Sequence, residues 1–261
     1  MGRLQDRIAI VTGAAKGMGR DICLALAREG AHVALTARDA TPLQAVAKEI
    51  EGLNRRALVH PGDVTDETAV AALVQATRAT FGGRIDILVN CAGITGPIET
   101  PVWKIDTRDF DEVLAVNIKG TFLPIKHVLP TMIEQRYGKI VVISGSSGLR
   151  GYKNRAAYSS SKWALRGLTR TVALEVGPYN VNVNALHPGI VEGDRMEKLR
   201  QQKARARGWT PAQVHEEYVH EMALRRVTTA EDIANAVCFL VSDDSKNMTG
   251  QSVTVDGGWD V

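Results

Sequence analysis

The chain has 261 residues, of which 44% are hydrophobic and 23% charged, and its formal net charge is +3. These values are ordinary for a globular protein with an apolar core, and they give no reason to expect a nucleic-acid partner. No run approaches the roughly 20 apolar residues that a membrane helix needs, so no membrane partner is expected. The first residues show no signal-peptide pattern, and Cys23, Cys91 and Cys238 are typical of free thiols, which together favour a cytoplasmic protein.

Short apolar runs rich in valine and isoleucine alternate with longer amphipathic stretches along most of the chain. The apolar runs are mostly continuous rather than alternating, which is typical of parallel strands covered on both faces. Strands are predicted at residues 8–11, 33–36, 57–60, 85–90, 139–143, 181–185 and 252–255, and helices at 17–29, 42–52, 66–81, 110–135, 158–176 and 230–241. This repetition predicts an α/β Rossmann fold, a single domain over residues 1–261 whose doubly wound parallel sheet has about seven strands.

One segment breaks this rhythm. Residues 194–227 are highly charged and precede the last predicted helix. An insertion beyond the carboxyl end of a strand lies where folds of this kind bind their ligands. We therefore expect residues 194–227 to form a helical substrate lid. Their basic stretch 198–207 has no interleaved aromatic residues, which argues against nucleic-acid binding.

A glycine-rich loop follows the first predicted strand. Gly13, Gly17 and Gly19 form the pattern G-x-x-x-G-x-G at the start of a predicted helix. Glycines allow a tight turn and a close approach of the backbone to a pyrophosphate, and the helix N-terminus offers free N–H groups to the phosphates. This loop, which includes Met18, is therefore predicted to bind a dinucleotide.

The end of the second predicted strand bears on the ribose of that dinucleotide. An acidic side chain there accepts from a ribose 2′-hydroxyl, whereas a basic one suits a 2′-phosphate. We place the acidic position at Ala37, which leaves it vacant; Arg38 follows, and Lys16 lies in the glycine loop. The two cations favour NADP(H) as the cofactor. Asp39 keeps NAD(H) open if the register of this strand differs.

Tyr158 and Lys162 lie four residues apart in a predicted helix, so both can point from one face. A free tyrosine titrates near pH ~10 and is a poor base at neutrality. A nearby ammonium favours the phenolate and brings the pKa toward the working pH. We predict that the pair is a proton donor and the cation that tunes it. The alternative is an amphipathic helix with an exposed lysine.

The motifs occur in one order along the chain: Thr12-Gly13-(x)3-Gly17-x-Gly19, Asp63-Val64, Asn90-Cys91-Ala92-Gly93, Asn117, Tyr158-(x)3-Lys162 and His187-Pro188-Gly189. Together they resemble the classical short-chain dehydrogenase/reductase family over essentially the whole chain. The resemblance implies an enzyme that interconverts a ketone or aldehyde and the corresponding alcohol with a nicotinamide cofactor. It also implies a homotetramer with the predicted helices 110–135 and 158–176 as its interface.

The resemblance implies roles at the matching positions. Tyr158 would be the catalytic acid/base, Lys162 would bind the nicotinamide ribose and lower the pKa of the tyrosine, and Asn117 would kink its helix and help to hold a water in a proton relay. The implied cofactor contacts are Asp63 and Val64 at the adenine, Asn90, Ala92 and Gly93 along the cofactor, and Pro188, Gly189 and Ile190 at the nicotinamide end.

The sequence departs from the family pattern at a serine that normally lies thirteen residues before the tyrosine. That serine hydrogen-bonds the substrate oxygen and stabilises charge developing there, but Gly145 occupies its position. Either Ser144 or Ser146 takes over, or the donor is missing. We predict Ser146 as the replacement, reached through a bulge at the strand end. Gly193 also replaces a threonine that often bonds the nicotinamide amide, so backbone groups are expected to hold that amide.

The substrate stays open among a 3-oxoacyl thioester, a sugar or polyol, and a small ketone. A non-catalytic NADP(H)-binding sensor is the alternative, supported by the missing serine. No metal is predicted, because His215 and His220 are five residues apart and a helical zinc pair needs i, i+4 spacing and a third ligand. Segments expected to frame the pocket hold four cations, some of which are hypothesised to face an anionic substrate group: Arg150, Lys153, Arg155 and Arg195.

Overall fold

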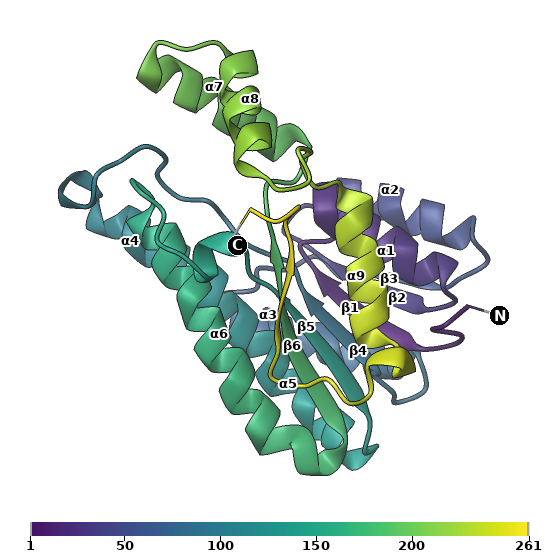
Figure 1. Cartoon of the computed structure of the whole chain (residues 1–261). Helices are drawn as coiled ribbons and strands as arrows, with labels where there is room; N and C mark the ends of the chain where they lie inside the picture. The colour runs from purple at the N-terminus through teal and green to yellow at the C-terminus, as the bar shows by residue number, and fades with distance from the viewer. Residues whose placement is uncertain (1, 260) are drawn as a thin grey trace.

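The protein, described by a computed structural model of residues 2–259 and 261, is built on one parallel sheet in the strand order β3-β2-β1-β4-β5-β6-β7. Each predicted strand is present, and the predicted doubly wound α/β fold is confirmed (Figure 1). The strands are β1 (Ile8–Thr12), β2 (His32–Thr36), β3 (Ala57–Val59), β4 (Ile87–Asn90), β5 (Gly138–Ile143), β6 (Val181–Pro188) and β7 (Ser252–Val255).

Helices cover both faces of the sheet (Figure 1). Successive strand residues point to opposite faces, so Ala9 and Val11 of β1 pack in one core cluster while Ile8 and Ile10 pack in another. Both faces are therefore apolar, which explains the continuous apolar runs of the sequence. The helices on the first face are α1 (Gly17–Arg28), α2 (Ala40–Glu51) and α9 (Ala230–Val241), and those on the second are α3 (Glu67–Thr80), α5 (Gly120–Glu134) and α6 (Ala156–Val176).

The carboxyl ends of the parallel strands share one edge of the sheet. The register pairs Thr12 at the end of β1 with Asn90 at the end of β4. β1 and β4 are neighbours where the strand order reverses, and ligands of such sheets bind in the crevice at that point. The loops after β1, β4, β5 and β6 therefore open toward one place.

The single helix predicted for residues 110–135 differs from the structure. α4 (Thr107–Leu114) and α5 are separate α-helices, joined by a wider π-helical turn over Ala115–Lys119. Such turns inside helices are frequent at functional sites. Asn117 lies in the middle of the turn and is buried, so the turn sets the direction of its side chain.

Residues 194–227 leave the sheet and return to it as a helical pair. α7 (Asp194–Arg207) and α8 (Pro211–Glu221) stand away from the sheet, at the top of Figure 1. A bridge between Val191 and Thr228 closes the base of the pair. A separate apolar cluster that includes Ala204, Val214 and Tyr218 packs the two helices together. We call residues 194–227 the helical hairpin; its function as a lid stays a prediction.

Short 3₁₀ turns complete the described secondary structure. They cover Val102–Lys104, Ser146–Gly148, Gly177–Tyr179 and Asp243–Ser245. The turn at Ser146–Gly148 follows β5 closely and carries part of the serine-rich departure from the family pattern. Across the residues that the structure describes, no helix has the length and apolar composition to cross a membrane.

Candidate active site

Tyr158 and Lys162 lie in the first turns of α6, beside the carboxyl end of β5. Lys162 is buried, and its Nζ donates to the Ile143 carbonyl oxygen at 3.0 Å. The same ammonium lies 5.6 Å from the centroid of the Tyr158 ring. The i, i+4 spacing therefore places both side chains on the face of α6 that looks onto the strand ends.

The charges around Tyr158 favour its phenolate. Burial opposes ionisation, but Lys162, Arg195 and Arg155 outweigh it, and the pKa of Tyr158 lies below its ordinary value of 10.0. Burial lowers the pKa of Lys162 below its ordinary 10.5, while the phenol of Tyr158 acts in the opposite direction. A tyrosine in this setting can give and take a proton nearer to neutral pH than a free tyrosine can.

Asn117 ties α6 to the loop after β4. Its Oδ1 accepts from the Ile94 N–H at 2.8 Å, and its Nδ2 donates to the Ile94 carbonyl at 3.0 Å and to Ser161 Oγ at 2.9 Å. These bonds hold the loop so that a Cβ on Gly93 would lie 3.8 Å from Lys162 Nζ. Asn117 lies in the π-turn, and both the implied helix kink and its part in a proton relay stay predictions.

The glycine loop has the geometry of a pyrophosphate site. Gly13 has a φ of +67°, and a Cβ on it would lie 2.9 Å from the Ala92 Cα, so glycine is required there. A Cβ on Gly19 would lie 2.1 Å from the Gly13 carbonyl oxygen. Lys16 is the N-cap of α1, and its side chain makes no capping hydrogen bond. The first N–H groups of α1 and the helix dipole are therefore available to an anion.

A buried amide without partners lies at the carboxyl edge of the sheet. Asn90 ends β4 and is 2% exposed, and neither its Nδ2 nor its Oδ1 has a hydrogen-bond partner among the described residues. An unpaired buried polar group costs about 1–3 kcal/mol, so a polar ligand is expected here. The glycine loop and this amide together fit a bound dinucleotide.

Arg38 and Asp63 lie close together beyond the ends of β2 and β3. Asp63 Oδ1 accepts from the Thr65 N–H and from Thr65 Oγ1, each at 2.8 Å. These bonds lower the pKa of the Asp63 carboxyl, burial opposes them, and the nearby charge of Arg38 adds to the lowering. Asp63 therefore stays ionised near Arg38, at the end of the crevice where the adenine half of a dinucleotide is predicted.

The register at the end of β2 is the predicted one. β2 ends at Thr36, which leaves Ala37 directly after the strand and Arg38 exposed beside it. Asp39 caps α2, because its side chain accepts from the Thr41 N–H at 3.0 Å. Asp39, the carboxylate on which the NAD(H) alternative depended, thus has one oxygen engaged at a helix start.

The end of β6 is held against β7 at the predicted nicotinamide end. The Gly189 N–H donates to the Val255 carbonyl at 3.0 Å. A Cβ on Gly189 would lie 2.6 Å from the Asp256 Cβ, so this close approach needs glycine. Pro188 and Ile190 flank that contact, and Ile190 is buried. Their position is thereby fixed next to the turn after β5.

One cavity of about 150 Å³ brings part of the predicted site together. The predicted residues that line it are Met18, Gly93, Ser146, Tyr158, Lys162, Pro188, Gly189 and Ile190. The others do not line it: Gly13, Lys16, Gly17, Gly19, Arg38, Asp63, Val64, Asn90, Ala92 and Asn117. This division suits an extended cofactor whose nicotinamide end alone reaches the cavity.

Further wall residues were not identified by any sequence motif. They come from the loop after β4, the loop before α6, the hairpin and the C-terminal segment: Thr95, Tyr152, Met196, Leu199, Lys203, Tyr218 and Trp259. The rings of Tyr152 and Tyr218 meet the Trp259 ring edge-on, with centroids 5.7 and 6.4 Å apart. These contacts join segments that are far apart in the chain, so local spacing carries no signal for them.

Two of the four singled-out cations reach the cavity. Arg155 and Arg195 line it, and Arg195 Nη2 donates to the Gly93 carbonyl at 2.9 Å. Arg150 and Lys153 line a neighbouring hollow instead. The hypothesis of a cation facing the substrate therefore narrows to Arg155 and Arg195.

Two serines of the turn after β5 already donate to backbone carbonyls. Ser144 Oγ donates to the Lys162 carbonyl at 3.1 Å, and Ser146 Oγ donates to the Pro188 carbonyl at 3.2 Å. A hydroxyl has one proton to donate. The arrangement does not favour the predicted role of Ser146 as a donor to the substrate, because its proton is used within the fold.

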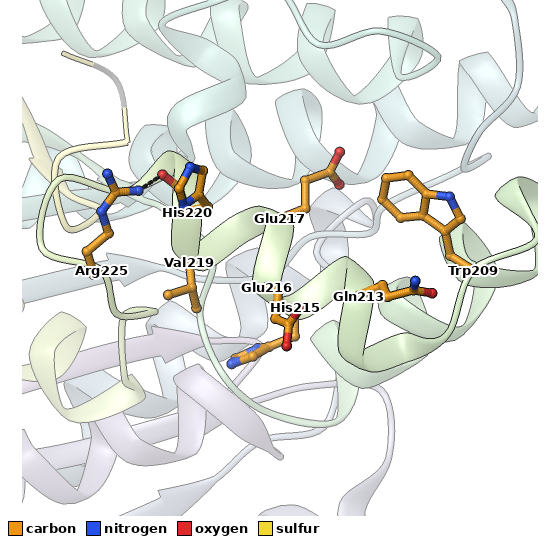
Figure 2. Close-up of a pocket in the computed structure, with 8 residues that line it drawn as sticks. All are labelled: Trp209, Gln213, His215, Glu216, Glu217, Val219, His220 and Arg225. Carbon is orange, nitrogen blue, oxygen red and sulfur yellow. Dashed lines mark hydrogen bonds between the residues drawn. The ribbon is translucent and has the colours of Figure 1, made fainter.

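A second hollow lies on α8, away from Tyr158. Figure 2 shows Trp209 at one end of it and His220 beside Arg225 at the other, where the Arg225 guanidinium donates to the His220 carbonyl. His215 also lines this hollow. No group of three or more His, Cys, Asp or Glu side chains suited to a metal ion occurs in the described part of the chain. The cavity at Tyr158 contains the predicted acid/base pair Tyr158 and Lys162 and is the candidate active site.

Known proteins resemble the chain over its whole length. A family model described as enoyl-(acyl carrier protein) reductase matches residues 13–260. A 3-oxoacyl-(acyl-carrier-protein) reductase of Thermotoga maritima is 35% identical over 256 residues, which cover 98% of each chain. An NAD⁺-bound xylitol dehydrogenase structure matches with a TM-score of 0.93 at 34% identity, over 98% of this chain and 99% of the other. An actinorhodin polyketide ketoreductase structure with NADPH matches with a TM-score of 0.93 at 28% identity, over 99% of both chains.

The family match, the fold and the site point to one class of reaction. The family model matches residues 13–260, a range that contains the glycines of the loop and the Tyr158–Lys162 pair. The chain is an oxidoreductase that interconverts a carbonyl group and an alcohol with NAD(P)(H), as the motifs predicted. It belongs to the short-chain dehydrogenase/reductase family.

Proposed function

We propose that the chain is an NADP(H)-dependent oxidoreductase of ketones or aldehydes in which Tyr158 is the acid/base. The observation that carries the proposal is the setting of this tyrosine. It faces the cavity, its pKa is lowered by neighbouring cations, and Lys162 lies 5.6 Å from its ring centroid. A phenol poised in this way suits proton transfer to and from an oxygen.

The residues of the cavity have distinct parts in the reaction. A bound nicotinamide supplies the hydride for the carbonyl carbon in reduction and takes it from the alcohol in oxidation. Tyr158 Oη gives its proton to the carbonyl oxygen in reduction and takes a proton from the alcohol in oxidation. Lys162 stabilises the phenolate that reduction leaves behind and is placed to hold the nicotinamide ribose. One hydride and one proton added to the carbonyl give the alcohol.

Arg38 and Lys16 support NADP(H) over NAD(H). Both are exposed at the crevice, Ala37 offers no carboxylate to a ribose hydroxyl, and Asp39 is engaged as a helix cap. A guanidinium binds a phosphate with two parallel hydrogen bonds, and a lysine adds a point charge. The compared structures hold NAD⁺ in one case and NADPH in another, so the preference rests on the side chains of this chain.

The proposed assembly is a homotetramer through α5 and α6. These helices carry large apolar side chains that are exposed in the single chain. Phe122 of α5 and Trp163 and Leu174 of α6 are 43%, 47% and 83% exposed. Large apolar side chains that are exposed in the single chain are candidates for protein–protein contacts. The tetramer is tested by the mass of the protein in solution.

The test is reduced-cofactor oxidation by the purified protein, with NADPH or NADH, against ketones, aldehydes and 3-oxoacyl thioesters, and the reverse reaction with polyols. We expect turnover with NADPH that falls about 1,000-fold in Tyr158→Phe. Tyr179→Phe is the matched control, because Tyr179 lies in a surface turn remote from the cavity.

The outcomes separate the proposals. Turnover that prefers NADH would contradict the assignment of Arg38 and Lys16. Full activity in Tyr158→Phe would remove the tyrosine from the chemistry. Tight cofactor binding with no turnover on any carbonyl would favour the sensor, for which Gly145 in place of the family's serine is the supporting observation.

A further inference from the structure

The cavity around Tyr158 carries an excess of positive charge. Its described lining residues include Arg155, Lys162, Arg195 and Lys203 and no aspartate or glutamate. Lys162 is accounted for by its place beside Tyr158, and Arg195 is exposed to solvent. Arg155 and Lys203 are buried cations for which the cavity itself offers no counter-charge.

Arg155 is the more isolated of these two cations. It is 6% exposed, its Nη2 reaches the Thr95 carbonyl only at 3.5 Å, and its Nε has no hydrogen-bond partner among the described residues. Its guanidinium carbon lies 4.7 Å from the centroid of the Tyr158 ring. A buried charge without a partner is costly, and an arginine fork matches a carboxylate with two parallel hydrogen bonds.

Two arginines of the hairpin that lie outside the cavity show the opposite arrangement. Arg200 pairs with Glu192 at 3.1 Å and with Glu197 at 3.0 Å, and Arg207 pairs with Glu217 at 2.9 Å. These two arginines thus have carboxylate partners supplied by the protein itself. Arg155 is 6% exposed and has no such ion pair within residues 2–259, so its guanidinium is a buried charge that an anionic ligand in the cavity can pair with.

Lys203 extends the positive wall from α7. It is 5% exposed, and its Nζ lies 4.6 Å from the Tyr218 ring centroid and 5.5 Å from that of Tyr152. Burial lowers the pKa of Lys203, and three glutamates act against that lowering from the neighbouring hollow. None of these glutamates forms an ion pair with Lys203 in the described part of the chain, so its charge adds to the field inside the cavity.

We propose that the substrate is a small oxo acid, or the hydroxy acid in the reverse direction, whose carboxylate pairs with Arg155 while its carbonyl oxygen faces Tyr158 Oη. The guanidinium and the phenol are close enough for one short molecule to reach both. The hydride goes to the carbonyl carbon and the proton of Tyr158 to its oxygen, and the carboxylate is unchanged. This inference rests on the proposed function and narrows its substrate class.

The test compares short oxo acids with their methyl esters, which keep the carbonyl and remove the charge. We expect the protein to prefer the acid, and Arg155→Gln to lower kcat/KM for the acid about 100-fold more than for the ester. Lys153→Gln is the matched control, because it removes a cation two residues away that does not line the cavity; its acid-to-ester ratio should match that of the unmodified protein.

Folding and cofactor binding of Arg155→Gln are checked by thermal melting and NADPH titration. If that variant does not fold, Arg155→Lys keeps the charge without the fork and should give an intermediate loss on the acid. Equal kcat/KM for acid and ester, or an equal loss on both in the variant, would overturn the carboxylate inference and leave the carbonyl activity intact. Absence of turnover on every carbonyl would instead overturn the proposed function.

A second inference rests on the turn after β5. A Cβ on Gly145 would lie 3.7 Å from Tyr158 Oη and also 3.7 Å from Ser147 Oγ. The position of the family's serine therefore faces the phenol, and the hydroxyl of Ser147 reaches the same space. Ser147 lines the cavity, and its Oγ has no hydrogen-bond partner among the described residues.

We infer that Ser147 supplies the hydroxyl that donates to the substrate oxygen in place of the missing serine. Ser144 and Ser146 have committed their protons to backbone carbonyls, whereas that of Ser147 is available to a ligand. A preorganised donor at an oxygen that gains charge stabilises the transition state. Ser147 is thus assigned as a catalytic residue beside Tyr158.

Ser147→Ala and Ser146→Ala are compared by kcat and KM. We expect Ser147→Ala to lose about 100-fold in kcat with a small change in KM, and Ser147→Thr, which keeps a hydroxyl, to recover part of the loss. Ser146→Ala should mainly lower thermal stability, because it removes the bond to the Pro188 carbonyl. The reverse pattern would restore the Ser146 prediction, and full activity in both variants would show that no serine donor is used.

Discussion

The nucleotide crevice and the helical hairpin are built on different principles. The crevice lies on buried parallel strands, and its glycines sit where a Cβ would collide with backbone, as at Gly13 and Gly19. The hairpin stands away from the sheet (Figure 1) and is packed by a small cluster around Val214 and Tyr218. In the crevice, the shape of the backbone forms the predicted phosphate site. The hairpin instead contributes side chains to one wall of the cavity.

This difference separates two kinds of specificity. Cofactor binding depends on backbone shape, which tolerates little change. We expect substrate choice to depend on the side chains of the hairpin and its neighbours that line the cavity with Tyr158, such as Lys203 and Arg195. Variants in one region should therefore change one function and spare the other, and the predictions below test that separation.

Gly19→Ala should give the largest loss in the crevice. The new Cβ would lie 2.1 Å from the Gly13 carbonyl oxygen, so the loop must shift. We expect NADPH affinity, measured by fluorescence titration, to fall about 100-fold. Gly177→Ala is the control, because Gly177 has helical φ and ψ angles and a Cβ there meets nothing within 4 Å. Unchanged affinity in Gly19→Ala would contradict the pyrophosphate assignment.

Val214→Asp should damage the hairpin and spare the crevice. Val214 is fully buried in the hairpin cluster, and burying an unpaired carboxylate there costs several kcal/mol. We expect kcat/KM for the carbonyl substrate to fall about 100-fold, with NADPH affinity changed less than about threefold. Glu216→Ala, on the exposed side of α8, should change neither quantity. Parallel loss of both functions in Val214→Asp would show that the two regions are not separable.

Arg38→Leu should shift the cofactor preference without touching the hairpin. A hydrogen-bonded ion pair with the 2′-phosphate is worth about 2 kcal/mol, so the ratio of kcat/KM for NADPH over NADH should fall about 30-fold. Arg28→Leu removes an exposed cation from the other end of α1 and serves as the control. A ratio unchanged in Arg38→Leu would mean that another group reads the ribose.

Arg195→Ala should have the smallest effect. The Arg195 side chain reaches from the hairpin to the Gly93 carbonyl and acts on Tyr158 only through its charge. Arg195 lowers the pKa of Tyr158, so its removal raises that pKa. Alcohol oxidation needs the phenolate, and its rate rises as pH passes the pKa of Tyr158. The rising limb of the oxidation profile should therefore move to higher pH in Arg195→Ala.

The control for this shift is Arg205→Ala, an exposed arginine on the same helix that does not line the cavity. Its pH profile should overlay that of the unmodified protein. A move of the Arg195→Ala limb to lower pH would contradict the assigned direction. The KM of Arg195→Ala is a second readout. In this variant, KM should rise more for an oxo acid than for its neutral ester.

The crevice could be predicted from sequence because its signals are local. Continuous apolar runs located the strands, and the spacing of Gly13, Gly17 and Gly19 located the first turn. The π-turn at Asn117 could not be predicted from the amphipathic pattern, because that pattern continues across it and does not reveal one extra residue in a turn; only the family resemblance implied an irregular helix there. The end of β2 at Thr36 was placed correctly, and with it the position of Arg38.

The substrate wall could not be predicted, because it is assembled from distant segments. Trp259 contacts Tyr152 of the loop before α6 and Tyr218 of the hairpin, which are 107 and 41 residues away in the chain. The choice of the serine that donates to the substrate depended on the backbone conformation of the turn after β5. The directions of Ser144, Ser146 and Ser147 differ there, although all three lie within four residues of each other.

The acid/base role of Tyr158 depends on the lowering of its pKa by Lys162, Arg195 and Arg155. The most direct measurement is the ultraviolet difference spectrum of the unmodified protein minus Tyr158→Phe as pH is raised, which needs no substrate. We predict a phenolate signal that appears below pH 10.0, the ordinary pKa of tyrosine, and that belongs to Tyr158 alone. A difference signal that appears only above pH 10.0 would contradict the account.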